Sequence, residues 1–104
     1  MNKFATVITI KTLVAECCNI PIIAIDGKTR IPEVNEAREI AVYFANKKTG
    51  MKPAEISNLI GFRSRTTTNR MISVVKGLIE VDKNFRKKIE LMEMIIDNAL
   101  NENR

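Results

Sequence analysis

Apolar residues recur along this chain of 104 residues mostly at spacings of three and four, which is the period of an α-helix. Strict alternation of apolar and polar residues, which is typical of a half-buried strand, is not the prevailing pattern. Only four glycines and three prolines are present to interrupt the period, and there is no repeat or low-complexity stretch. We therefore expect an all-α fold, and the length predicts a single domain over residues 1–104.

The first quarter of the chain predicts one helix followed by a short apolar segment. The helix covers Ile8 to about Cys18 and has one apolar stripe, formed by Ile10, Leu13, Val14 and Cys17. The isoleucines at positions 20, 22, 23 and 25 are dense enough to form core in a short helical turn. Their β-branching leaves a strand open as the alternative.

The next segment predicts a longer helix with clear signals at both ends. Pro32 suits a helix start, and the last turn carries Lys47 and Lys48 before Gly50, where cations and a glycine stop are favoured. The expected core positions of this helix are Val34, Ala37, Ile40, Ala41, Phe44 and Ala45.

A short helix, a glycine turn and a longer helix follow. The short helix runs from Pro53 to about Ile60, is closed by Gly61, and should bury Ile56, Leu59 and Ile60. The longer helix runs from roughly Arg65 to Ile79 with Ser64 as its N-cap, and its apolar positions are Met71, Val74, Val75 and Leu78. This order predicts a helix-turn-helix, whose second helix enters the DNA major groove with its N-terminus first.

The final helix is expected from about Asp82 to Asn101. It should pack on the domain through Phe85, Ile89, Met92, Ile96 and Ala99 or Leu100.

The expected second helix of the helix-turn-helix opens with Arg65-Thr66-Thr67-Thr68-Asn69-Arg70. Threonine is a poor helix former, so helix propensity does not account for three in succession. At a helix start that faces a DNA groove, their hydroxyl and methyl groups can contact phosphates, base edges and thymine methyl groups. The alternative is that these residues only cap and solvate a turn.

The net charge of +5 is concentrated in the middle of the chain. Residues 47–76 contain seven basic residues against Glu55 alone, a net charge of +6, whereas residues 1–46 are neutral and residues 77–104 carry −1. A local excess of this kind is what binding to the phosphates of a nucleic acid requires, and a solvated surface is the alternative reading.

Several kinds of chemistry have no candidate residues. The chain has no histidine, and Cys17 and Cys18 are adjacent, so neither a zinc site nor a thiol–imidazole pair is indicated. We expect both thiols and the methionines 51, 71, 92 and 94 to be core. Phosphate-binding glycine motifs and an apolar run of membrane-spanning length are missing from the sequence. We expect no enzymatic activity, metal, cofactor, bound nucleotide or membrane association.

The segment Glu36-Ala-Arg-Glu-Ile-Ala-Val-Tyr-Phe-Ala45, with Thr49-Gly50, Glu55-Ile56 and the residues after Gly61, resembles the C-terminal DNA-binding domain of the bacterial replication initiator DnaA. The resemblance extends over about residues 8–91. Its most specific part is Gly61-Phe62-Arg63-Ser64-Arg65-Thr66-Thr67-Thr68, where the family has Gly-Gly-Arg-Asp-His-Thr-Thr-Val at the start of its recognition helix. This resemblance implies a helix-turn-helix that binds double-stranded DNA sequence-specifically at origin-type repeats.

The resemblance also assigns residues to the two DNA grooves. Arg30, preceded by Lys28, matches the arginine of a basic loop that enters the minor groove, and Thr66 and Thr67 match the threonine pair at the major groove. The family's Asp and His are replaced here by Ser64 and Arg65. Because a guanidinium typically pairs with guanine, the preferred DNA sequence should differ from the family's.

We therefore expect sequence-specific binding of double-stranded DNA, linked to replication initiation or its regulation, by a cytoplasmic protein at the nucleoid. The 104 residues leave no room for the family's ATPase module, so we expect no ATPase activity. The alternatives are an interaction module that kept the fold and binds a protein such as a replication initiator, and a transcriptional regulator. The candidate DNA-contacting residues are Lys28, Arg30, Lys48, Lys52, Arg63, Ser64, Arg65, Thr66, Thr67, Asn69 and Arg70.

Overall fold

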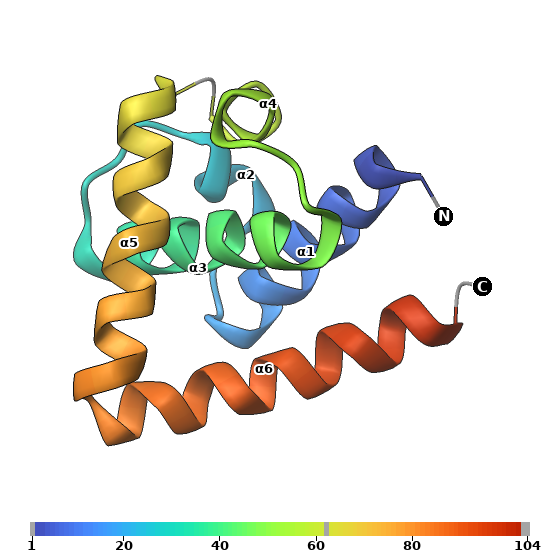
Figure 1. Cartoon of the computed structure of the whole chain (residues 1–104), viewed down its shortest axis with the longest axis vertical. Coiled ribbons are helices and arrows are strands. Elements are labelled where there is room, and N and C mark those ends of the chain that lie inside the picture. The colour runs from blue at the N-terminus through green and yellow to red at the C-terminus, as the bar shows by residue number, and fades with distance from the viewer. Residues whose placement is uncertain (1, 62, 103–104) are drawn as a thin grey trace.

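The computed structural model describes residues 2–61 and 63–102, and within these ranges the chain is helical without any strand. The all-α prediction is therefore confirmed. Phe62, which belongs to the motif that carries the family resemblance, lies outside the described residues. The helices are α1 (Lys3–Cys17), α2 (Ile22–Asp26), α3 (Pro32–Thr49), α4 (Pro53–Ser57), α5 (Arg65–Val81) and α6 (Lys83–Glu102) (Figure 1).

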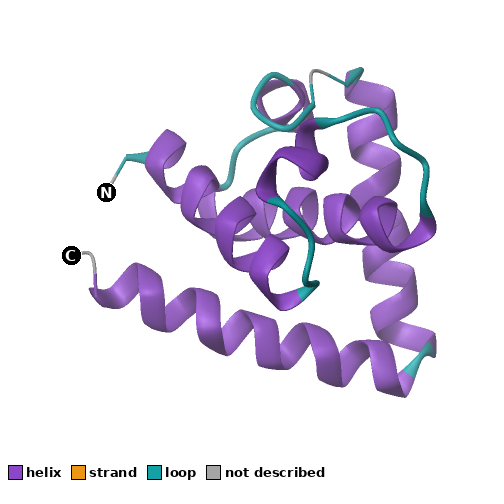
Figure 2. Ribbon diagram, turned by 180° about the vertical axis from the view of Figure 1, so that it is seen from behind, coloured by secondary structure: helices purple, strands orange, loops and turns teal. Residues whose placement is uncertain are grey.

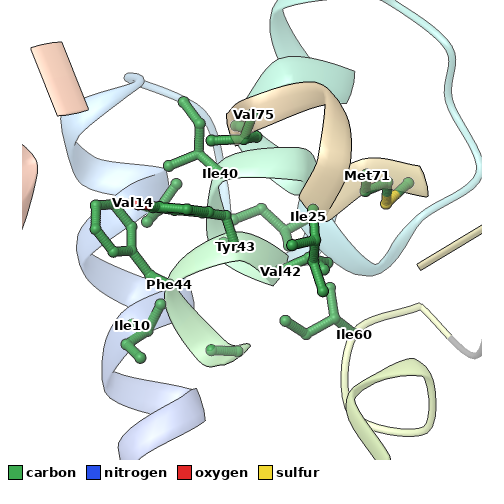
Figure 3. Close-up of a cluster of buried hydrophobic side chains, with 14 of the residues drawn as sticks. Ile10, Val14, Ile25, Ile40, Val42, Tyr43, Phe44, Ile60, Met71 and Val75 are labelled. Carbon is green, nitrogen blue, oxygen red and sulfur yellow. The ribbon is translucent and has the colours of Figure 1, made fainter. Parts of the chain in front are cut away.

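The central helix of the domain is α3, which contacts α1, α2, α4 and α5. Its Ile40 and Phe44 pack among Ile10 and Val14 of α1 and Val75 of α5 (Figure 3). Contact on several sides explains why α3 buries residues around most of its circumference rather than along one stripe. All six core positions predicted for this helix are buried, which confirms that prediction.

The ends of α3 agree with the sequence signals. Pro32 occupies the first turn, and Gly50 adopts the left-handed conformation with φ = 72° while its N–H donates to the Asn46 carbonyl at 3.0 Å. Glycine suits this position because a Cβ is unfavourable at positive φ.

The first helix begins five residues earlier than predicted. The side-chain oxygen of Asn2 accepts a hydrogen bond of 2.8 Å from the N–H of Ala5, and this cap extends α1 to Lys3. The buried stripe consists of Val7, Ile10 and Val14, whereas Cys17 is exposed. The expectation of a buried Cys17 is wrong, because this residue is the last of α1 and is exposed there, and Cys18 is only partly buried.

The two short segments correct further predictions. The isoleucine-rich stretch is the helix α2, but Ile22 and Ile23 are exposed and only Ile25 is fully buried. A helix of five residues contacts α1 and α3 with a single side, so most of its apolar residues cannot be covered. The helix α4 ends at Ser57 rather than Ile60, because tight turns follow it up to Gly61, although Ile60 remains buried.

In Figure 1, the chain turns sharply after α5, and α6 runs beneath the rest of the domain. The predicted buried residues Phe85, Ile89, Met92 and Ile96 of α6 are confirmed. Two predicted core residues are exposed instead: Val74 on α5 by 38% and Met94 on α6 by 63%. Seen from behind, α1 lies along α6, and the start of α1 and the end of α6 are on the same side (Figure 2).

Candidate DNA interface

A groove of about 530 Å³ lies between the loop that follows α2 and the start of α5. Five of the ten lining residues are basic, and none is acidic. Such a surface attracts a polyanion, because no acidic side chain in the lining repels negative charge. The lining residues are Lys28, Thr29, Arg30, Asn35, Arg38, Gly61, Arg63, Thr67, Arg70 and Met71.

One wall of the groove depends on Arg38, a side chain of α3 that is only 2% exposed. Its Nε donates to the Ile25 carbonyl at 2.8 Å, and its Nη2 donates to the carbonyls of Ala24 at 3.1 Å and Gly27 at 2.9 Å. Its Nη1 donates to the Thr29 carbonyl at 3.2 Å. These bonds satisfy carbonyls at the end of α2 and fix the backbone on both sides of Lys28.

Arg63 reaches the same loop from the other side of the groove. Its Nη2 donates to the Gly27 carbonyl at 2.5 Å, so the guanidinium groups of Arg38 and Arg63 share one acceptor. Burial lowers the pKa of both arginines, and the nearby charge of Arg63 lowers the pKa of Arg38 further. Arginine stays protonated in proteins despite such shifts, so both groups remain cationic donors.

The turn before α5 is shaped by Gly61. This glycine has φ = 79°, and a Cβ placed there would clash with the Arg63 guanidinium. Gly61 is therefore suited both to the left-handed backbone and to the close approach of Arg63.

The start of α5 presents a polar face to solvent. Ser64 caps the helix as predicted, because its Oγ accepts from the Thr67 N–H at 3.1 Å. Thr66, Asn69 and Arg70 are exposed at the spacing i, i+3, i+4, and Ser73 continues this face at i+7. Ser73 was not among the predicted residues, although its spacing from Thr66 is a signal that could have identified it.

The three consecutive threonines of α5 have different environments. Thr66 is exposed, Thr67 lines the groove and its Oγ1 accepts from the Ser64 hydroxyl at 3.0 Å, and Thr68 is 1% exposed. The expectation that all three face a groove is therefore wrong for Thr68, which packs into the core. Of the three, only Thr66 is exposed.

The structure brings most of the predicted DNA-contacting residues to one end of the molecule. Lys28, Arg30, Arg63, Thr67 and Arg70 line the groove, and Ser64, Arg65, Thr66 and Asn69 are exposed on or next to the first turns of α5. Lys52 is exposed just before α4, where its N–H donates to the Glu55 carboxylate at 3.1 Å.

Lys48 is not brought to the groove. Its Nζ lies 2.7 Å from Glu93 and 2.9 Å from Asp97, both on α6, and the Nζ of Lys47 lies 2.8 Å from the same Glu93 carboxylate. Part of the excess positive charge of residues 47–76 is thus paired with acidic residues of the protein itself. The groove also contains basic residues from the segment 1–46, whose net charge is zero: Lys28, Arg30 and Arg38 all line it.

Neither a cluster of metal-binding side chains nor a membrane-spanning helix is found among the described residues. Residues 2–61 and 63–102 contain no group of three His, Cys, Asp or Glu side chains that could hold a metal ion. Among the helices of the same ranges, none combines the length and the apolar character needed to cross a bilayer.

Comparison with known proteins matches residues 7–75 to the family of the bacterial DnaA protein helix-turn-helix. The chain is 32% identical over 95 residues to the chromosomal replication initiator protein DnaA of Bacteroides thetaiotaomicron, which covers 91% of this chain and 20% of that protein. The DnaA protein of Mesoplasma florum is 33% identical over 84 residues, covering 81% of this chain and 19% of that protein. The chain thus spans about a fifth of the length of these relatives.

Proposed function

The chain belongs to the bacterial DnaA helix-turn-helix family, and on this basis we propose that it binds double-stranded DNA sequence-specifically through the start of α5. The observation that carries the proposal is the groove with five basic and no acidic lining residues, next to the exposed polar face of α5. DNA supplies the dense negative charge that such a surface attracts.

In the proposed complex, the first two turns of α5 enter the major groove. Arg65 is exposed and its guanidinium can donate two hydrogen bonds to guanine, and Asn69 can pair with adenine in the same way. Thr66 is exposed in the first turn of α5, where its methyl group can contact a thymine methyl. These side chains supply the sequence preference, since phosphate contacts carry none directly.

The loop after α2 supplies the second contact in this proposal. Lys28 and Arg30 are exposed at the groove, and the backbone on both sides of Lys28 is fixed through the Gly27 and Thr29 carbonyls. A loop that is already ordered loses less conformational entropy on binding. We place Arg30 in the minor groove next to the α5 site and Lys52 against a phosphate.

The biological role that we propose is recognition of origin-type DNA sites in replication initiation or its regulation. The named relatives are chromosomal replication initiator proteins, and the matched part is their helix-turn-helix family segment. In this proposal the chain acts by occupying DNA and does not hydrolyse ATP.

The proposal is tested by selecting bound duplexes from a random pool at a stated salt concentration. We expect one preferred sequence, bound about 10³-fold or more tightly than random DNA, with an affinity that falls steeply as salt rises. The matched control is Lys3→Ala, which removes one exposed cation on α1 far along the chain from the proposed contacts. A pool without enrichment and an affinity that is insensitive to salt would overturn the proposal.

A further inference from the structure

The outer side of α6 carries a second, short apolar stripe that the domain does not cover. It consists of Leu91 and Met94, each 63% exposed, and Ile95, which is 45% exposed. At about 100° per residue this stripe is centred roughly 140° around the helix from the buried stripe. The stripe therefore faces away from the body of the domain. An apolar patch that is exposed in this way is a candidate interaction surface.

The charges of α6 are separated along its length. Residues 83–88 contain four basic and no acidic residues, and residues 90–102 contain four acidic and no basic residues. Several of them bind within the chain: Lys88 pairs with Glu36, and Glu93 and Asp97 pair with Lys48. None of the ion pairs in the described residues involves Lys87 or Glu102, and both are exposed.

Polar residues extend the apolar stripe in both directions along the same side of α6. Lys87 precedes Leu91 by one helical turn. In the other direction, the exposed Asn98 follows Met94 by one turn, and Glu102 follows Asn98 by one more. The exposed side of α6 therefore has an apolar centre, a polar rim and opposite charges at its two ends, which is the usual composition of a protein interface.

This arrangement is complementary to a second copy of itself. When another α6 is laid antiparallel on the first, with the twofold axis between Met94 and Ile95, each Leu91 meets an Asn98 and each Lys87 meets a Glu102. A parallel arrangement would oppose like charges at both ends, which charge pairing between helices disfavours.

We propose that the occupant of this stripe is a second copy of the chain, bound through an antiparallel pairing of the two α6 helices. The surface is self-complementary, as a twofold interface requires. The contact is limited to one helix of 20 residues, about 30 Å long, and each copy contributes only three apolar side chains. The interface is therefore small, and the dimer is weak and reversible.

The pairing has a consequence that rests on the proposed DNA binding. In Figure 1, α6 lies at the end of α5 opposite to its N-terminus, which forms part of the candidate DNA interface. A second copy docked beyond α6 therefore has its own groove at the far end of the assembly. The dimer holds two separate DNA segments rather than two adjacent half-sites of one duplex.

The dimer is tested without DNA by sedimentation of the full chain from about 1 μM to about 1 mM, a range that includes weak association. We expect a reversible monomer–dimer equilibrium. Met94→Glu should weaken the dimer at least about tenfold, because it places two charges in the apolar centre. The matched control is Ile23→Glu, which puts the same charge on an apolar residue of α2 that is 79% exposed and should leave dimerisation unchanged.

The antiparallel register is tested by exchanging the charges at the two ends. Lys87→Glu and Glu102→Lys should each weaken the dimer about tenfold, because each creates repulsion at both ends of the interface. The double variant should restore the dimer. A wild-type chain that stays monomeric throughout, a dimer insensitive to Met94→Glu, or a double variant that stays weak would overturn the proposal.

A capture experiment separates this inference from the proposed DNA binding. An immobilised duplex, chosen by the selection described above, binds the protein and is then offered a second, fluorescent copy of the same duplex. We expect capture by the wild type and loss of capture with Met94→Glu, while both proteins bind the first duplex. Binding of the first duplex without capture of the second would contradict the dimer, whereas failure to bind the first would contradict DNA binding alone.

Discussion

Arg38 and Arg63 donate to the same acceptor, the carbonyl oxygen of Gly27, at 2.9 Å and 2.5 Å. Burial lowers the pKa of both guanidinium groups, and the nearby negative charge of Asp26 opposes this effect, which helps two like charges to converge there. The shared acceptor connects α3, the loop after α2 and the turn before α5. The two proposed DNA-contacting segments are thereby held in one fixed relation.

Replacement of Arg38 should strongly destabilise the fold. Arg38→Ala leaves several backbone carbonyls near α2 without a donor, so we expect a loss of about 3 kcal/mol in the free energy of unfolding, measured by urea denaturation. Arg38→Lys should rescue little, because one ammonium cannot replace a planar fork of donors. The control Arg30→Ala removes an exposed arginine and should change stability by less than about 0.5 kcal/mol. An Arg38→Ala variant as stable as this control would contradict the role of Arg38.

Replacement by alanine should change stability in opposite directions at Gly61, which precedes α5, and at Gly77, which is inside it. Gly61→Ala should cost at least about 1 kcal/mol in thermal or urea unfolding, because it strains a backbone with φ = 79° and displaces Arg63. Gly77→Ala should stabilise the chain by about 0.5–1 kcal/mol, because Gly77 is inside α5 and nothing lies near the added Cβ. Equal effects of the two substitutions would contradict this account of the turn.

The ion pairs between α3 and α6 should make the free energy of unfolding depend on pH. Hydrogen bonds from Lys47 and Lys48 hold the pKa of Glu93 below its ordinary value of 4.5. Because this pKa is lower in the folded chain than in the unfolded chain, the ionised Glu93 stabilises the fold fully at any pH above its pKa in the unfolded chain. The stabilisation is lost as the pH falls through the pKa of Glu93 in the folded chain. Glu93→Gln should therefore cost up to about 1 kcal/mol near pH 7 and almost nothing near pH 2, measured by urea unfolding at each pH.

Glu39 provides a control for the pH experiment, because its pKa is shifted in the opposite direction to that of Glu93. Burial and the charge of Glu36 raise the pKa of this half-buried carboxyl group. Its ionised form therefore opposes folding, and protonation relieves that cost as the pH falls through the raised pKa. Glu39→Gln should leave the chain at least as stable as the wild type near pH 7. A Glu39→Gln variant with the same pH profile as Glu93→Gln would contradict the assignment of these shifts.

Base recognition by α5 is tested most simply at Arg65. Arg65→Ala should weaken binding to the preferred duplex by about 1–3 kcal/mol and relax the preference at one base pair, measured by anisotropy titrations on a set of single-substituted duplexes. Equal weakening on every duplex would instead identify Arg65 as a phosphate contact.

Local signals in the sequence predicted much of the fold. Pro32 and Gly50 bound α3, Ser64 caps α5, and the helical period of Phe85 to Ile96 identified the buried side of α6. Each of these features depends on residues within a few positions of one another, so it can be recognised without the tertiary structure.

The features that sequence reasoning missed depend on contacts between distant segments. Arg38 lies on a helix and resembles an ordinary surface cation, but the folded chain buries it against the end of α2. Lys48 binds Glu93, 45 residues away, which no local pattern indicates. Thr68 belongs to a polar run and still packs into the core, because it shares the buried side of α5 with Met71 and Val75. The sequence therefore located the candidate site but not the side chains that hold it in place.

The central claim is most directly tested by the salt dependence of binding to the selected duplex and to a scrambled duplex of the same composition. We predict tight binding of the selected duplex, much weaker binding of the scrambled one, and a steep loss of affinity for both as salt increases. Arg65→Ala should reduce the ratio of the two affinities, whereas Lys3→Ala should leave it unchanged. Equal affinities for the two duplexes in the wild-type protein would contradict sequence-specific DNA binding.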